Sequence, residues 1–178
     1  MKNPLAPHVM FGRFADVSPD FLRLRGVRLL FSDVDNTLAP YETPDPSDEV
    51  KAWVAALKKA GIRLVFISNN HAQRLERFAR ELDVPFYPDS KKPLPNVFRR
   101  VAKEYDVPLM ACAVLGDQVF TDVLGARALG MQAFMVPPIK DKTTLFFRAK
   151  RYLERPVMRY YAKGHPGHTD LSFWNIKE

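Results

Sequence analysis

The chain has 178 residues, of which 47% are apolar, and a formal net charge of +7. This length and composition predict one globular domain over residues 1–178, with a core at 24–139 and a basic amphipathic tail at 140–178. No apolar run suits a transmembrane helix or a secretory signal, and a single cysteine, Cys112, excludes an internal disulfide. These features indicate a cytoplasmic protein.

Apolar runs and amphipathic segments alternate along the chain. Strands are predicted at residues 27–35, 62–70, 84–90, 111–118 and 132–139, and helices at 47–61, 72–83, 93–106 and 120–130. Ser47 is a candidate N-cap for the first of these helices, and Gly61 is a candidate stop. Continuously apolar strands separated by helices are typical of a three-layer, Rossmann-like α/β fold, in which helices cover both faces of a parallel sheet.

Four acidic residues lie where two of the predicted strands end. Asp33 and Asp35 end the first strand, and Asp117 and Asp122 lie at the end of another. Parallel strands present their carboxyl ends at one edge of a sheet, where crowded carboxylates would repel each other unless a cation lay among them. Oxygen ligands favour Mg²⁺ as that cation. An isolated Asp-x-Asp-x-Thr can also cap a turn, but two acidic motifs at one edge favour a metal site.

Residues suited to holding a phosphate accompany these acids. Ser68 and Asn69 precede the helix predicted at 72–83, where a hydroxyl and free backbone N–H groups bind oxyanions. Lys92 lies before the next helix, and Thr37 offers a further hydroxyl near Asp33. Ser68 and Asn69 could alternatively form an ordinary cap between a strand and a helix, and Lys91 and Lys92 could be a pair of solvated lysines.

The segments DVDNT, SNN, KKP and GDQVFTD occur in this order in the sequence. In order and spacing they resemble the four motifs of the haloacid dehalogenase superfamily of phosphohydrolases. The segments DFLRLRGVRLLFSDVDNTL and GDQVFTDVLGARALG resemble more closely its YqeG-type subfamily (subclass IIIA), which is related to mitochondrial phosphatidylglycerophosphate phosphatases. The resemblance implies the HAD-like version of the α/β fold. The short gaps between the motifs leave no room for a cap domain.

The resemblance also implies a role for each motif residue. Asp33 would be the nucleophile, and Asp35 would be the general acid and then the general base. Mg²⁺ would be held by the side chains of Asp33 and Asp117 and by the backbone carbonyl of Asp35, while Asp122 would support the site without contacting the ion. The residues that would hold the phosphoryl oxygens are Ser68, Asn69 through its backbone, and Lys92.

The tail is strongly basic. Residues 140–163 hold eight Lys or Arg and two acids, which accounts for six of the seven net positive charges. On a helical wheel, apolar side chains cluster on one side and Arg148, Arg151, Arg155 and Arg159 on the other, with Pro156 expected to kink or end the helix. This pattern suits an interfacial helix whose arginines contact an anionic membrane. It equally suits a terminal helix that packs its apolar face on the sheet.

The sequence therefore predicts a Mg²⁺-dependent phosphatase. By resemblance, its substrate would be the phospholipid headgroup of phosphatidylglycerophosphate, and the protein would bind peripherally to the inner face of the cell membrane. A soluble sugar phosphate or nucleotide is the alternative substrate. An RNA- or ribosome-associated basic protein is an alternative of another class, but no RNA-binding motif is recognisable, which disfavours a nucleic-acid partner.

Overall fold

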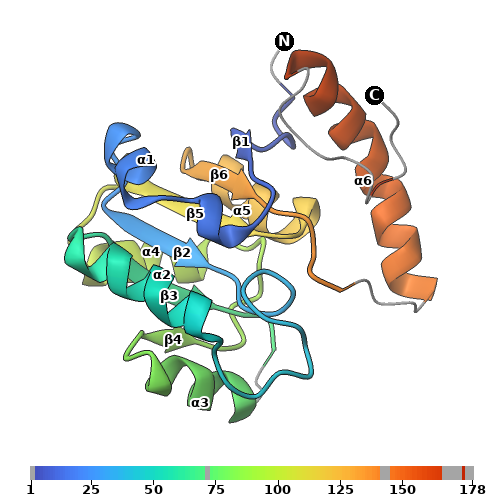
Figure 1. Cartoon of the computed structure of the whole chain (residues 1–178). Helices are drawn as coiled ribbons and strands as arrows, with labels where there is room; N and C mark the ends of the chain where they lie inside the picture. Colours follow the sequence, from blue (N-terminus) through green and yellow to red (C-terminus); the bar gives the residue numbers. More distant parts are fainter. Residues whose placement is uncertain (1–2, 71–72, 141–144, 166–173, 175–178) are drawn as a thin grey trace.

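The computed structural model describes residues 3–70, 73–140, 145–165 and 174. Its centre is a six-stranded parallel sheet in the order β1-β6-β5-β2-β3-β4 (Figure 1). The strands are β1 (Val9–Met10), β2 (Leu29–Ser32), β3 (Arg63–Ile67), β4 (Phe86–Tyr87), β5 (Cys112–Gly116) and β6 (Gln132–Met135). The α-helices are α1 (Pro19–Leu24), α2 (Asp48–Lys59), α3 (Gln73–Glu81), α4 (Asn96–Glu104), α5 (Leu124–Ala128) and α6 (Leu145–Gly164).

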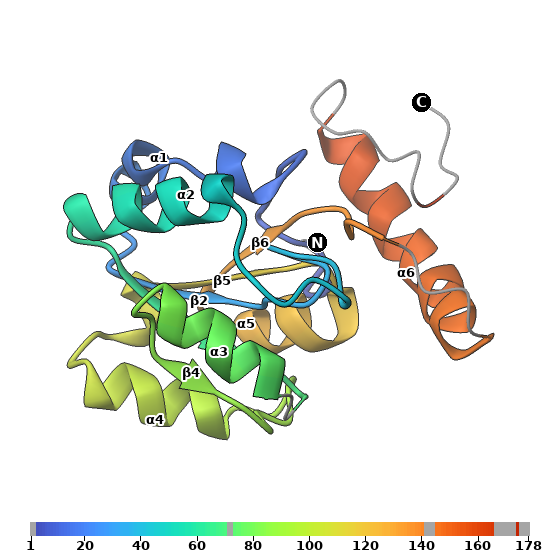
Figure 2. The same ribbon diagram turned by 60° about the horizontal axis from the view of Figure 1, so that its bottom comes forward.

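Helices cover both faces of the sheet, as predicted. Successive side chains of β2 point to opposite faces, so Leu30 joins one core cluster and Phe31 the other. The cluster around Leu30 receives side chains from α1, α2 and α3, and the cluster around Phe31 receives side chains from α4, α5 and α6. Figure 2 shows α2 and α4 on opposite sides of the strands. The sequence prediction of a three-layer α/β fold is confirmed.

The capping residues predicted for α2 act as expected. The Ser47 hydroxyl accepts a hydrogen bond from the Val50 backbone N–H at 3.3 Å. Gly61 follows the helix with a φ of +75°, a conformation that ends a helix and that glycine adopts without steric cost. Between these two signals, α2 buries Val50, Trp53, Val54 and Leu57 on one face.

Some elements differ from the sequence prediction. The edge strand β1 and the short helix α1 were not predicted, since neither two nor six residues give a readable periodicity. The predicted helix at 120–130 is a π-helical turn, Val119–Val123, followed by α5. The helix predicted from Ala72 is described from Gln73 on, and Ala72 itself lies outside the described residues.

The structure corrects one part of the prediction for Pro156, that it ends the tail helix, and a kink at this residue stays a prediction. Pro156 lies inside α6, which runs on to Gly164. Proline removes one backbone N–H from a helix. Side chains on both sides of it are anchored in the fold, namely Arg151 before it and Met158 after it, so the helix continues.

The buried face of α6 differs from the apolar face of the helical wheel, which was expected to meet either a membrane or the sheet. Leu145 and Leu153 of the predicted apolar face are exposed, whereas Val157 of the same face is buried, so only a small part of this face packs on the sheet. Among the side chains of α6 that the structure describes, the buried ones are those of Arg151, Glu154, Val157, Met158 and Tyr161. Throughout the described ranges, the structure contains no helix long and apolar enough to cross a bilayer.

Candidate active site

The predicted site residues follow three adjacent strands at the centre of the sheet. The register pairs Ser32, the last residue of β2, with Phe66 of β3 and Leu115 of β5. The chain then leaves these strands at one edge, which carries Asp33, Ser68 and Asp117. The prediction that these strand ends share one edge of the sheet is confirmed.

A small cavity of about 50 Å³ lies between the loops at this edge. Six residues predicted from the sequence line it, namely Asp33, Asp35, Ser68, Asn69, Lys92 and Asp122. Thr37 does not line it, and its buried hydroxyl has no hydrogen-bond partner among the described residues. Asp117 lies deeper, with no exposed surface.

Lys92 links two of the acids. Its ammonium lies 2.7 Å from Asp33 Oδ1 and 2.7 Å from Asp122 Oδ1, and its side chain is only 3% exposed. Asn69 holds the loop that carries this lysine, because its side-chain oxygen accepts from the Lys92 backbone N–H at 2.7 Å. The Asn69 amide also donates to the Lys92 carbonyl at 3.0 Å. Asn69 thus positions Lys92, a function that the sequence prediction did not include.

The protonation states of this cluster depend on charge balance. Burial opposes the charged form of Lys92, but Asp122 and Asp33 outweigh it and raise its pKa above the usual value, so the ammonium stays charged. Burial raises the pKa of Asp33 to about 8, against the attraction of Lys92. A further positive ion beside Asp33 would favour its carboxylate, which is the form that a nucleophile requires.

Asp35 occupies a different environment from Asp33. Its Oδ2 accepts a hydrogen bond from the Asn70 side-chain amide at 3.0 Å, and the Asn70 backbone N–H donates to Ser68 Oγ at 3.0 Å. Tyr41, in the segment after this motif, also lines the cavity. The two acids of the motif therefore have separate partners, which allows them separate chemical roles.

Asp117 is held by α6. Arg151 donates from Nη2 to Asp117 Oδ2 at 2.6 Å and from Nη1 to the Asp117 carbonyl at 2.9 Å. Burial raises the pKa of Asp117 to about 6, while Arg151 lowers it. The other carboxylate oxygen, Oδ1, is buried and accepts no hydrogen bond from the described residues.

The oxygen atoms of this site fit a hard divalent cation. An orphaned carboxylate oxygen on Asp117, a second carboxylate on Asp33 and the backbone carbonyl of Asp35 offer the donor type that Mg²⁺ prefers. No group of three or more His, Cys, Asp or Glu side chains in the described parts of the chain is arranged to hold a metal ion. The donor set inferred from the sequence does not require such a group, because it contains only two carboxylates and one backbone carbonyl. Mg²⁺ commonly completes its coordination shell with water molecules and phosphate oxygens.

Gly116 makes room for the Asp122 side chain. A Cβ at position 116 would lie 2.3 Å from Asp122 Cγ and 2.6 Å from its Cβ, distances at which the whole side chain must move. Asp122 is one of the two anchors of Lys92. We therefore expect Gly116→Ala to reduce phosphate release by about 10-fold or more, because a small misplacement of catalytic groups is costly.

A steady-state assay measures this effect, and Gly164→Ala is the matched control. A Cβ at Gly164 would meet no heavy atom within 4 Å. Equal activity of Gly116→Ala and the wild type would contradict the positional role given to Asp122.

One of the four residues predicted to contact a membrane lies in the interior of the structure. Arg151 is 8% exposed and bound to Asp117, so its predicted placement on the exposed face of α6 was wrong. Arg148 and Arg159 are exposed and Arg155 is partly exposed, and membrane contact by these three stays a prediction.

Several residues at the site were missed by sequence reasoning. The cavity also contains Tyr41, Asn70, Gln118 and Thr121, and α6 brings Arg151 and Glu154 to Asp117. The spacing Arg-x-x-Glu was a readable signal, since opposite charges three residues apart share one face of a helix. No local signal indicates that this face meets Asp117.

Comparison with known proteins agrees with this geometry. The family model described as haloacid dehalogenase-like hydrolase matches residues 9–130. The chain is 31% identical to "Probable phosphatase YqeG" of Bacillus subtilis over 150 residues, which cover 84% of this chain and 87% of that protein. It is 29% identical to the glyceraldehyde 3-phosphate phosphatase of Pyrococcus abyssi over 85 residues, which cover 43% of this chain and 36% of that one.

Solved structures show the same fold. The cobalt-bound deoxy-D-mannose-octulosonate 8-phosphate phosphatase of Haemophilus influenzae superposes with a TM-score of 0.54 at 17% identity, covering 87% of this chain and 99% of that one. The 3-deoxy-D-manno-octulosonate 8-phosphate phosphatase of Yersinia pestis gives a TM-score of 0.51 at 18% identity, covering 65% and 67%. The extent of the family match and the similarity to the Bacillus protein establish that the chain belongs to the haloacid dehalogenase-like hydrolases.

Proposed function

We propose that this hydrolase is a Mg²⁺-dependent phosphatase that forms an aspartyl-phosphate on Asp33. One observation carries the proposal: Asp33, Asp35 and Lys92 line one cavity, with Asp117 buried at the same edge of the sheet. Similarity to the Bacillus protein, named as a probable phosphatase, supports the same reaction class. The side chains of Asp33 and Asp117 and the Asp35 carbonyl would hold Mg²⁺, which supplies positive charge to the phosphoryl oxygens when bound.

The first half of the reaction transfers the phosphoryl group to Asp33. An oxygen of the Asp33 carboxylate forms a bond to phosphorus as the bond from phosphorus to the ester oxygen breaks. Asp35 gives its proton to that ester oxygen, which leaves as an alcohol. Lys92 and Ser68 hold the phosphoryl oxygens, where negative charge is spread in the transition state.

The second half of the reaction restores the enzyme. Asp35, now a carboxylate, takes a proton from a water molecule whose oxygen forms a bond to phosphorus. The bond between phosphorus and the Asp33 oxygen breaks, which releases inorganic phosphate and regenerates the Asp33 carboxylate. The hydrogen bond from Asn70 to Asp35 Oδ2 orients the acid for both steps.

We propose phosphatidylglycerophosphate as the substrate, with phosphatidylglycerol as the product. In the described residues between β2 and β3 and between β3 and β4, the α-helices are α2 and α3, one in each segment, which leaves these segments too short for a cap domain over the site. An uncapped site suits a phosphate presented on a surface. Exposed Leu145, Tyr152 and Leu153 lie on α6 together with exposed Arg148, which supports contact with an anionic bilayer.

A soluble phosphate ester is the second candidate substrate. The names of the similar proteins from Haemophilus and Pyrococcus specify phosphatases of small sugar phosphates. The lipid and the soluble substrate share the phosphomonoester, and they differ in whether the rest of the molecule lies in a membrane.

Phosphate release distinguishes these candidates. Phosphatidylglycerophosphate in anionic vesicles is compared with a panel of soluble sugar phosphates and nucleotides, with Mg²⁺ and with EDTA. We expect Mg²⁺-dependent release that is fastest from the lipid, and flotation of the protein with the vesicles. Fast turnover of soluble esters without vesicle binding would favour the second candidate, whereas no release from any ester would overturn the phosphatase proposal.

A further inference from the structure

Helix α6 contributes buried charged side chains to the catalytic edge of the sheet. Arg151 bonds both the Asp117 side chain, at 2.6 Å, and the Asp117 carbonyl, at 2.9 Å. Its Nη1 also donates to Glu154 Oε2 at 2.8 Å. A guanidinium held from several sides in this way keeps a fixed orientation, because its planar donors match these acceptors.

Glu154 ties the same contact to the loop after β5. This carboxylate has no exposed surface, and its Oε1 accepts from the Val119 backbone N–H at 3.1 Å. Its Oε2 also accepts from Trp174 Nε1 at 3.2 Å. Val119 begins the π-helical turn that carries Asp122, so Glu154 and Arg151 together connect α6 to both acids of this motif.

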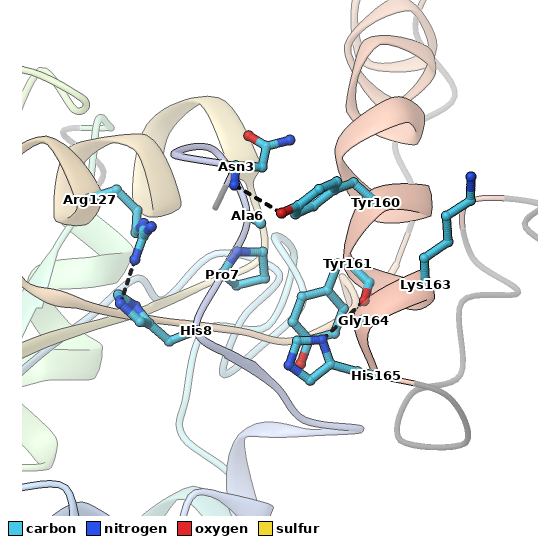
Figure 3. Close-up of a pocket in the computed structure, with 10 residues that line it drawn as sticks. All are labelled: Asn3, Ala6, Pro7, His8, Arg127, Tyr160, Tyr161, Lys163, Gly164 and His165. Carbon is cyan, nitrogen blue, oxygen red and sulfur yellow. Dashed lines mark hydrogen bonds between the residues drawn. The ribbon is translucent and has the colours of Figure 1, made fainter. Parts of the chain in front are cut away.

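The far end of α6 is fixed independently. The Tyr161 hydroxyl accepts a hydrogen bond from the Met10 backbone N–H of β1 at 2.9 Å. Val157, Met158 and Tyr161 also belong to the core cluster on one face of the sheet. Figure 3 shows Tyr160 and Tyr161 on α6 facing the N-terminal segment that carries Asn3, Ala6 and Pro7. These residues line a cavity of about 430 Å³. Contacts at two separate places therefore hold Arg151 against Asp117.

These contacts leave one oxygen of Asp117 available. Arg151 occupies Oδ2, while Oδ1 is buried and has no hydrogen-bond partner among the described residues. Arg151 is shared between the carboxylates of Asp117 and Glu154, so with both ionised the three groups keep one net negative charge that another cation can balance. A carboxylate that is fixed through one oxygen presents the other oxygen in a defined direction. Residues that hydrogen-bond to metal ligands commonly orient those ligands in this way.

We propose that Arg151 is a positioning residue that fixes Asp117 with Oδ1 directed at the Mg²⁺ site. This inference rests on the proposed function, because it concerns the ion that the proposed reaction uses. Helix α6 is then part of the active site, and the Arg151–Glu154 pair is the element that makes it so.

Competition between Arg151 and Mg²⁺ for Asp117 is the alternative role, and it predicts the opposite change in Mg²⁺ affinity. If Arg151 competed with Mg²⁺ for Asp117, its removal would free a second carboxylate oxygen and strengthen Mg²⁺ binding. If Arg151 positions Asp117, its removal lets the carboxylate turn, and Mg²⁺ binding weakens. The direction of the change in affinity therefore decides between the two roles.

The experiment is a calorimetric titration of the full chain with Mg²⁺. We expect Arg151→Met to bind Mg²⁺ about 10–100-fold more weakly than the wild type, the range found for residues that orient metal ligands. In an activity titration, saturating Mg²⁺ should recover most of kcat, because the catalytic groups Asp33 and Asp35 are unchanged. Arg99→Met, at an exposed position of α4, is the matched control.

A second variant keeps the test decisive if Arg151→Met does not fold. Arg151→Lys retains the charge but offers a single ammonium in place of the two guanidinium nitrogens that bond Asp117, so we expect an intermediate loss of Mg²⁺ affinity. Unchanged or tighter Mg²⁺ binding by either folded variant would overturn the positioning role. If the wild type itself neither binds Mg²⁺ nor releases phosphate, the proposed function is wrong, which is a separate outcome.

Discussion

Asp33→Asn is expected to abolish Mg²⁺-dependent phosphate release, by at least about 10⁴-fold, while the protein stays folded. The amide that replaces the carboxylate is a poor nucleophile towards phosphorus, and it removes one negative charge from the proposed ion site. Its oxygen can still accept the hydrogen bond that Lys92 now donates to Asp33 Oδ1, so the loop geometry is preserved.

Two measurements test this expectation together. Phosphate release gives the loss of activity, and a thermal melt of the same sample shows whether the fold is retained. Asp20→Asn is the matched control, because the Asp20 side chain is 87% exposed and lies on α1. Turnover by Asp33→Asn at the wild-type rate would remove Asp33 from the role of nucleophile.

The parts of the fold that depend on local patterns were predictable from the sequence. The four apolar residues that α2 buries recur at helical spacing, and Ser47 and Gly61 mark its ends. Parallel strands also bring their carboxyl ends to one edge, which was enough to predict that Asp33, Ser68 and Asp117 lie together. These inferences need no knowledge of which loops touch.

The parts that depend on contacts between distant segments were not predictable. A lysine beside a phosphate was expected of Lys92, but nothing local indicates that its ammonium lies between Asp33 and Asp122. Arg151 was placed at the surface because the helical wheel puts it opposite the apolar side chains, where an unpaired arginine is expected to face solvent. Its partner Asp117 is 34 residues away, so only the folded structure reveals the pair.

Lys92→Met is the second substitution with a large expected effect, and this one concerns stability as well as activity. In the wild type, one ammonium lies 2.7 Å from Asp33 and 2.7 Å from Asp122. Removing it leaves two buried carboxylates without their common partner, and breaking a buried ion pair in this way costs about 3–5 kcal/mol of stability. Activity should fall by about 10²–10³-fold, because a donor to the phosphoryl oxygens is lost.

Mg²⁺ should partly reverse the loss of stability. A divalent ion held by Asp33 offsets the repulsion that Lys92 otherwise relieves, so Mg²⁺ should raise the Tm of Lys92→Met by more than it raises that of the wild type. Thermal melts with Mg²⁺ and with EDTA measure this difference. Lys91→Met is the matched control, since Lys91 is the exposed neighbour in the same loop. Both substitutions remove one ammonium, but only Lys92 lies between the two acids. A larger loss of activity in Lys91→Met than in Lys92→Met would therefore assign phosphate binding to the exposed lysine.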